Sequence, residues 1–233
     1  MTTTDTASFS LRSIAVPAFG PALLFSIGEG AILPVVALSA RDLGASVAVA
    51  ALVVTLIGLG SWFFNLPASL ITLKFGERWA IVGAAAASTV ALAAAALAPL
   101  VPGGLWLLAA AMLVVGMAAS VFSLARQKYL TEAVPVILRA RALSTLGGVN
   151  RIGIFIGPFI GAAAMQFAGI TGAYWVGVVA MAAAAVLSVT IPDLVAKPAA
   201  DDGVPVPQAT LRSVAVSHAG VFLSVGMGVL LLS

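Results

Sequence analysis

The sequence predicts an all-α polytopic membrane protein. Hydrophobic residues make up 62% of the 233 residues and charged residues only 8%, whereas soluble domains carry about 25% charged residues. A soluble fold has too little interior to bury so much apolar surface. The apolar residues also occur in blocks of about 20, the length that a helix needs to cross the hydrocarbon core. Composition, low charge and block length therefore predict several membrane-spanning helices.

The predicted elements follow one another in a simple order. A polar tail covers residues 1–13, and the apolar run after it is too long for a signal-peptide core, so we expect an uncleaved first span. A bundle of six spans is expected over residues 14–191. A central cytoplasmic loop, rich in Pro and Asp, is expected over 192–213, and 214–233 is predicted to start a seventh span that is still apolar at its last residue. The six predicted spans are 14–39, 44–66, 79–100, 104–124, 143–168 and 170–191.

The basic residues predict an orientation. Most of them lie in the N-terminal tail and in alternate connections, and the other connections carry only Arg41. Because cytoplasmic loops are enriched in Lys and Arg, the N-terminus is expected in the cytoplasm of a plasma or inner membrane. The same distribution explains the net charge of +3 without a nucleic-acid partner. The residues expected inside are Arg12, Lys74, Arg78, Arg126, Lys128, Arg139, Arg141, Lys197 and Arg212.

The sequence offers little for catalysis or for a cofactor. It has no cysteine and one histidine, His218, which excludes a structural disulfide and leaves no credible zinc, haem or iron–sulfur ligand set. It also shows no glycine-rich phosphate loop, no paired catalytic carboxylates and no Ser/His/Asp set. We therefore expect no enzyme, no metal site and no cofactor.

Two charged residues stand inside predicted spans, where such residues are expensive and usually functional. Glu29 lies just past the middle of the first span, and we expect it to hold and release a proton as its site alternates between dry and wet. The alternative is a protonated glutamic acid that bridges two helices without a transport role. Arg151 lies roughly 12 Å inside the fifth span at about 1.5 Å per residue, where it should face water, carbonyl groups or an anion. Snorkelling to the inner surface is its alternative.

Segment 69–79, SLITLKFGERW, resembles the cytoplasmic loop of the major facilitator superfamily, G-x-x-x-D-R-x-G-x-R-R. Lys74, Gly76 and Arg78 match that pattern, while Leu73 stands where the family has an aspartate. In the family this loop latches the cytoplasmic gate. The resemblance implies the same role for the three matching residues, but Leu73 cannot supply the acidic part of the latch.

Two further segments resemble the drug:proton antiporters of the same family. Residues 28–34, GEGAILP, are similar to a signature of the first helix, and residues 153–162, GIFIGPFIGA, are similar to the antiporter signature G-x-x-x-G-P-x-x-G-G. One position departs from the pattern, because Met112 replaces an arginine that such exporters carry on the fourth span. Arg126 lies nearer the cytoplasmic end and is not equivalent.

The antiporter-like motif contains Gly153, Gly157 and Gly161, which repeat every four residues and so lie along one side of a helix. Small residues permit close backbone contact between helices in lipid, and Pro158 removes a backbone hydrogen bond and favours a kink. Such a helix can rock against its neighbour, as alternating access requires. A static packing face is the alternative.

The resemblance implies the N-terminal half of a transporter, built from two inverted three-helix repeats. Segments 73–79 and 165–175 occupy equivalent positions in these repeats and share a Phe, a following Gly and a Trp. The implied function is proton-coupled efflux of a small hydrophobic or drug-like solute. The implied partners are the lipid bilayer, the solute, protons and a missing C-terminal half. A carrier of another solute, such as a sugar or metabolite, and a membrane scaffold without a transport cycle are the alternatives.

Overall fold

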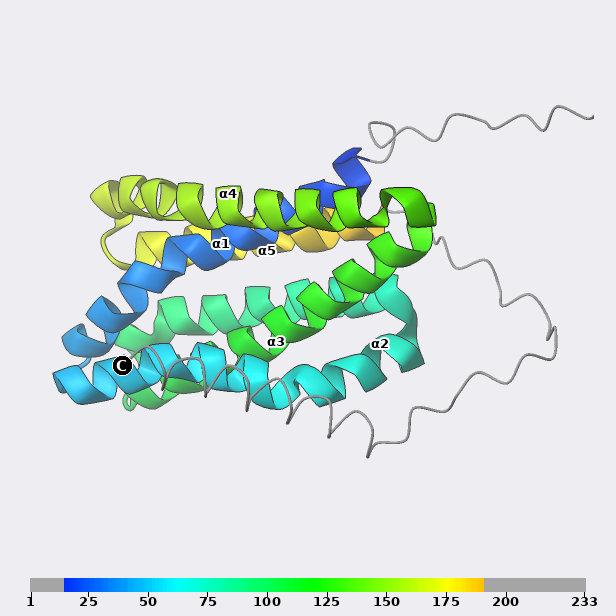
Figure 1. Cartoon of the computed structure of the whole chain (residues 1–233). Helices are drawn as coiled ribbons and strands as arrows, with labels where there is room; N and C mark the ends of the chain where they lie inside the picture. Colours follow the sequence, from blue (N-terminus) through cyan, green and yellow to red (C-terminus); the bar gives the residue numbers. More distant parts are fainter. Residues whose placement is uncertain (1–14, 191–233) are drawn as a thin grey trace, which may run out of the picture. The chain divides into compact units, whose positions relative to one another are not determined.

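The computed structural model describes residues 15–190, and five α-helices and a short 3-10 helix make up this part of the chain (Figure 1). It contains no strand, so the predicted all-α class is confirmed, and each helix is long and apolar enough to cross a membrane. The predicted tail, central loop and seventh span lie outside the described residues. The elements are α1 (Ala15–Asp42), α2 (Val47–Leu97), η1 (Ala98–Leu100), α3 (Gly104–Ala133), α4 (Val136–Ala168) and α5 (Thr171–Val189).

Helix α2 consists of two helical segments that meet at Gly76. The backbone of Gly76 is not helical, with φ 79° and ψ 163°, and Figure 1 shows the chain reversing direction within α2. The second and third predicted spans lie on these two segments. The described residues therefore contain five α-helices where six spans were predicted, because the two segments of α2 are joined by a turn at one glycine and not by a separate loop.

A similar backbone conformation recurs at Gly169, which matches Gly76 in the short similarity between segments 73–79 and 165–175. Gly169 ends α4 with φ 62° and ψ −159°, close to the values at Gly76. A positive φ is uncommon for residues with a Cβ, so both turns favour glycine. The short similarity between segments 73–79 and 165–175 thus corresponds to a similar local turn.

The helices pack through small residues. Helix α1 packs against α4 and α5, and α2 packs against α3 and α5. Alanine is the most frequent buried apolar residue in the described part of the chain, whereas large apolar side chains such as Leu70, Trp106 and Phe167 are exposed. Helices in lipid gain little from hydrophobic burial and approach closely through small residues. The distribution therefore suits a bundle surrounded by lipid.

Three helical segments extend beyond the predicted spans at the end of the bundle where Gly76 lies, and the first segment of α2 is one of them, because it continues from residue 66 to the turn at Gly76. Helix α3 continues to Ala133, beyond the predicted end at residue 124, and α4 begins at Val136, before the predicted start at residue 143. Hydropathy marks where the hydrocarbon ends, but Ala, Arg, Gln and Lys are good helix formers and continue the helix into water. The extension of α3 places Arg126 and Lys128 on a helix, where the sequence suggested a loop.

Candidate functional site

A polar cavity of about 310 Å³ lies between α1, α2, α3 and α4. Most of the side chains that line it are hydroxyls, amides or charged groups, although the helices that supply them are largely apolar. Polar groups inside a membrane bundle mark pathways for solutes or ions. The polar lining residues are Ser26, Glu29, Ser61, Asn65, Ser120, Ser123, Arg126, Gln127 and Asn150.

Glu29 lies in the middle of α1 and lines this cavity. Ser26 stands three residues earlier and so lies on the same face of the helix. Its hydroxyl donates to Oδ1 of Asn150 on α4 at 3.3 Å. The carboxyl group of Glu29 is therefore part of a polar cluster shared by α1 and α4, in the interior position that the sequence predicted. Its role in proton transfer stays a prediction.

Arg126 is the second charged residue of the cavity, and the sequence interpretation missed it. Its side chain is only 1% exposed, and its guanidinium carbon lies 5.8 Å from the centre of the Tyr129 ring. The interpretation placed Arg126 in a connection because the predicted span ended at residue 124. Helical spacing contained the missing signal: Arg126 follows the apolar Phe122 by four residues and precedes Tyr129 by three, so all three share one face.

Arg151 does not reach the cavity. Its side chain is exposed, and the neighbouring Asn150 and Ile154 line the cavity instead. Gly153 and Gly157 face α1. Successive residues of a helix are rotated by about 100°, so Arg151 lies on a different side of α4 from these glycines. The sequence therefore indicated the depth of Arg151 along α4 but not the direction of its side chain.

Hydrogen bonds between neutral side chains connect the helices around the cavity. Besides the bond between Ser26 and Asn150, the hydroxyl of Ser120 on α3 donates to Oδ1 of Asn65 on α2 at 3.0 Å. Close by, the rings of Phe25 and Phe122 stack, with their centres 4.1 Å apart. The cavity wall thus combines an aromatic stack between α1 and α3 with one polar link between α1 and α4 and one between α2 and α3.

The glycines of α4 lie against the backbone of α1. A Cβ added to Gly157 would lie 2.5 Å from the carbonyl oxygen of Ile27 and 2.7 Å from the backbone nitrogen of Ala31. A Cβ added to Gly153 would lie 2.6 Å from the Cβ of Ser26, and Gly161 has similarly little room against Ala31. The two helices therefore contact each other through main chain, which only residues without side chains permit.

Lys74 and Arg78, which belong to segment 69–79, make different contacts at the turn of α2. Lys74 is exposed, and its Nζ lies 5.4 Å from the centre of the Phe75 ring. Arg78 follows the non-helical Gly76, and its Nη2 donates a hydrogen bond to the carbonyl oxygen of Val189 at the end of α5. Arg78 therefore links the end of α5 to the turn between the two segments of α2.

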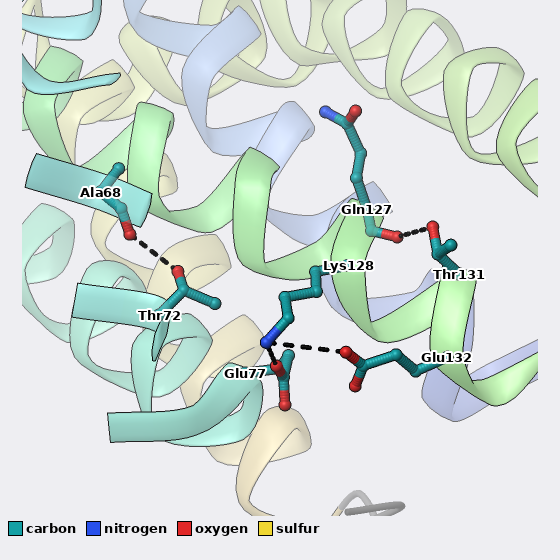
Figure 2. A network of polar contacts seen from close by, with 7 residues as sticks. All are labelled: Ala68, Thr72, Glu77, Gln127, Lys128, Thr131 and Glu132. Atoms are coloured by element: carbon teal, nitrogen blue, oxygen red, sulfur yellow. Dashed lines mark hydrogen bonds and ion pairs between the residues drawn. The ribbon is translucent and has the colours of Figure 1, made fainter. Parts of the chain in front are cut away.

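Glu77, next to the Gly76 turn, holds an ion pair that the sequence did not reveal. Its buried carboxylate pairs with Nζ of Lys128 on α3, and that Nζ also lies 3.6 Å from a carboxylate oxygen of Glu132 (Figure 2). The partners Glu77 and Lys128 are 51 residues apart in the chain, so their pairing depends on the packing of α3 against α2.

Comparison with known proteins agrees with the resemblance to the major facilitator superfamily and does not test the antiporter subtype. The family model described as Major Facilitator Superfamily matches residues 19–233. No curated protein matches the chain.

Proposed function

This chain belongs to the Major Facilitator Superfamily, and from that premise we propose that it takes part in proton-coupled transport of a small molecule by alternating access. Family membership indicates membrane transport by a multi-pass membrane protein and not an enzymatic reaction. The observation that carries the proposal is the polar cavity that contains Glu29 and Arg126 between four apolar helices.

The proposal includes an architecture. The two segments of α2 cross the membrane separately, so the described residues form six crossings arranged as two inverted three-helix units. Residues 192–213 then form the central loop and 214–233 start the seventh span, and a C-terminal half completes the transporter. The turn at Gly76, the matching turn at Gly169 and the basic residues near the Gly76 end support this arrangement, with that end in the cytoplasm.

The two charged groups of the cavity suggest how a proton is coupled to a solute. Arginine stays cationic under physiological conditions, so the protonation of Glu29 decides whether the cavity is neutral or positively charged. A solute that binds one of these two forms better than the other links its own movement to proton uptake and release. Export is the direction that the antiporter-like motif at residues 153–162 supports.

The proposed movement involves α4 and α1. The two helices approach closely at Gly153 and Gly157, where no side chain of α4 stands between them. Small rotations of α4 would change the link between Asn150 and Ser26 in the cavity wall. We therefore assign the gating contact to this glycine face.

The cavity lining favours a polar solute over the hydrophobic, drug-like solute that the motifs imply. Its hydroxyl and amide groups match a solute with hydrogen-bonding groups of its own, so a carrier of a sugar or metabolite is the second candidate function. A scaffold without a transport cycle fits less well. Burying Glu29 and Arg126 costs several kcal/mol for each ion, and an inert bundle gains nothing from them.

The variant Glu29→Gln tests the proposal in the complete transporter, reconstituted in vesicles with a pH gradient. Glutamine is nearly isosteric and keeps a hydrogen bond, but it cannot release a proton. Uphill transport should be lost while downhill exchange of the solute survives. Asp42→Asn makes the same chemical change at the exposed end of α1 and should leave accumulation unchanged. Equal accumulation by wild type and Glu29→Gln would remove Glu29 from the coupling mechanism.

A further inference from the structure

A second cavity, which we call the apolar groove, lies between the two segments of α2 and helix α3. It has a volume of about 530 Å³, and its lining side chains are apolar apart from the indole N–H of Trp79. Phe64, Phe75 and Trp79 are its aromatic lining residues. Gly83 lies one turn after Trp79 on the same segment, and Met117 and Val121 line the groove from α3. We propose that this groove binds one acyl chain of an anionic phospholipid whose phosphate is held by Lys74.

The dimensions of the groove match one leaflet of a bilayer. Its lining runs along the first segment of α2 from Phe64 to Phe75, which corresponds to about 16 Å at 1.5 Å per residue. Half of the hydrocarbon core is about 15 Å. An acyl chain that entered along the helix would therefore fill the groove while its head group stayed at the membrane surface.

The groove opens on the outer surface of the bundle. The side chains of Phe75 and Trp79 are 57% and 59% exposed within the described part of the chain. Both lie next to the turn at Gly76, which joins the two segments of α2. The aromatic rings thus form the edge of the groove at its surface end, where a lipid head group would be placed.

Positive charge stands at this edge. Nζ of Lys74 lies 5.4 Å from the centre of the Phe75 ring, and the guanidinium carbon of Arg78 lies 5.8 Å from the centre of the Trp79 ring. Arg78 is also bonded to the carbonyl of Val189, so the exposed Lys74 is the main group for a phosphate. An apolar groove with a cation at its mouth is complementary to an anionic amphiphile. One such basic residue at the membrane surface favours anionic over zwitterionic lipid about fivefold.

Fluorescence quenching by brominated lipid tests this site, because bromine in an acyl chain quenches a nearby indole. Trp79 lines the groove, and replacing Trp62, Trp106 and Trp175 with Phe makes it the sole reporter. The purified chain is placed in phosphatidylcholine vesicles that contain a small, equal fraction of brominated phosphatidylglycerol or brominated phosphatidylcholine. We expect the phosphatidylglycerol to quench Trp79 with an apparent association constant about fivefold larger. A chain with Trp106 as its sole tryptophan, 80% exposed at the start of α3, should show no preference.

Two variants separate the head-group contact from the acyl-chain contact. Lys74→Gln should abolish the preference for phosphatidylglycerol and leave quenching by phosphatidylcholine. Gly83→Leu should weaken quenching by both lipids, because a Cβ at Gly83 meets no atom within 4 Å and the leucine can occupy the groove. Gly58→Leu is the matched control, since Gly58 also has open space but does not line the groove.

Two results would overturn the proposal. Equal quenching of Trp79 by the two lipids would identify the contact as ordinary surrounding lipid. Absence of quenching by either lipid would mean that protein covers the groove, either another part of this chain or a second copy. The Lys74→Gln comparison does not depend on whether Gly83→Leu folds, because it changes an exposed side chain.

Discussion

Replacing Gly157 with alanine tests the close contact between α4 and α1 most directly. The added Cβ would lie 2.5 Å from the carbonyl oxygen of Ile27, about 1 Å less than an ordinary contact between heavy atoms. The neighbouring atoms belong to the backbone of α1, so no flexible side chain can move aside. The helices must separate, and separation removes the dispersion contacts that hold them together in lipid.

Overpacking of this kind costs about 1–3 kcal/mol, and we expect Gly157→Ala to lower the free energy of unfolding by that amount. Gly148→Ala is the matched control, because it makes the same change in the same helix where an added Cβ meets no atom within 4 Å. Alanine favours helix over glycine by up to about 1 kcal/mol, so the control should be neutral or slightly stabilising. Gly157→Ala should therefore be destabilising, and Gly148→Ala should not.

The measurement is unfolding of the purified chain in mixed micelles, followed by far-ultraviolet circular dichroism as the fraction of dodecyl sulfate increases. Equal unfolding midpoints for Gly157→Ala and Gly148→Ala would refute the close backbone contact. A loss of stability in both variants would instead show that α4 tolerates no added methyl group, whatever lies opposite. Only a selective loss at Gly157 supports the reasoning.

Two further predictions concern the turn of α2. A double-mutant cycle with Glu77→Gln and Lys128→Met should give a coupling free energy of about 1 kcal/mol. This coupling should fall as salt is added, because the side chain of Lys128 is partly exposed. A coupling of zero at low salt would show that the ion pair does not stabilise the protein. Gly76→Ala should lower the free energy of unfolding by about 1–3 kcal/mol. The cause is the backbone conformation, φ 79° and ψ 163°, which side chains with a Cβ rarely adopt, since an added Cβ would meet no atom within 4 Å. Gly83→Ala, in an open helical position, is its control, and equal stability of the two variants would rule out this turn conformation.

Composition and the length of the apolar blocks predicted the all-α membrane class, and short motifs predicted the family. Neither prediction depends on which distant residues contact each other. The glycine spacing in α4 likewise predicted a helix face without side chains. Only the structure shows that α1 packs against this face. Arg126 was missed because hydropathy detects the end of the hydrocarbon and not the end of a helix. The pairing of Glu77 with Lys128 joins residues 51 positions apart, and no local pattern reports it.

Helix α1 links the proposed proton site to the proposed gating contact. One side of this helix faces the cavity through Glu29 and Ser26, and its backbone between Ile27 and Ala31 carries the contact with Gly157. These positions lie within about two turns of the same helix. A displacement of α4 along α1 therefore changes the surroundings of Glu29 directly, without a long chain of intermediate residues. Conversely, protonation of Glu29 would alter the charge beside the bond between Ser26 and Asn150, so we expect any coupling between the two proposed sites to be reciprocal.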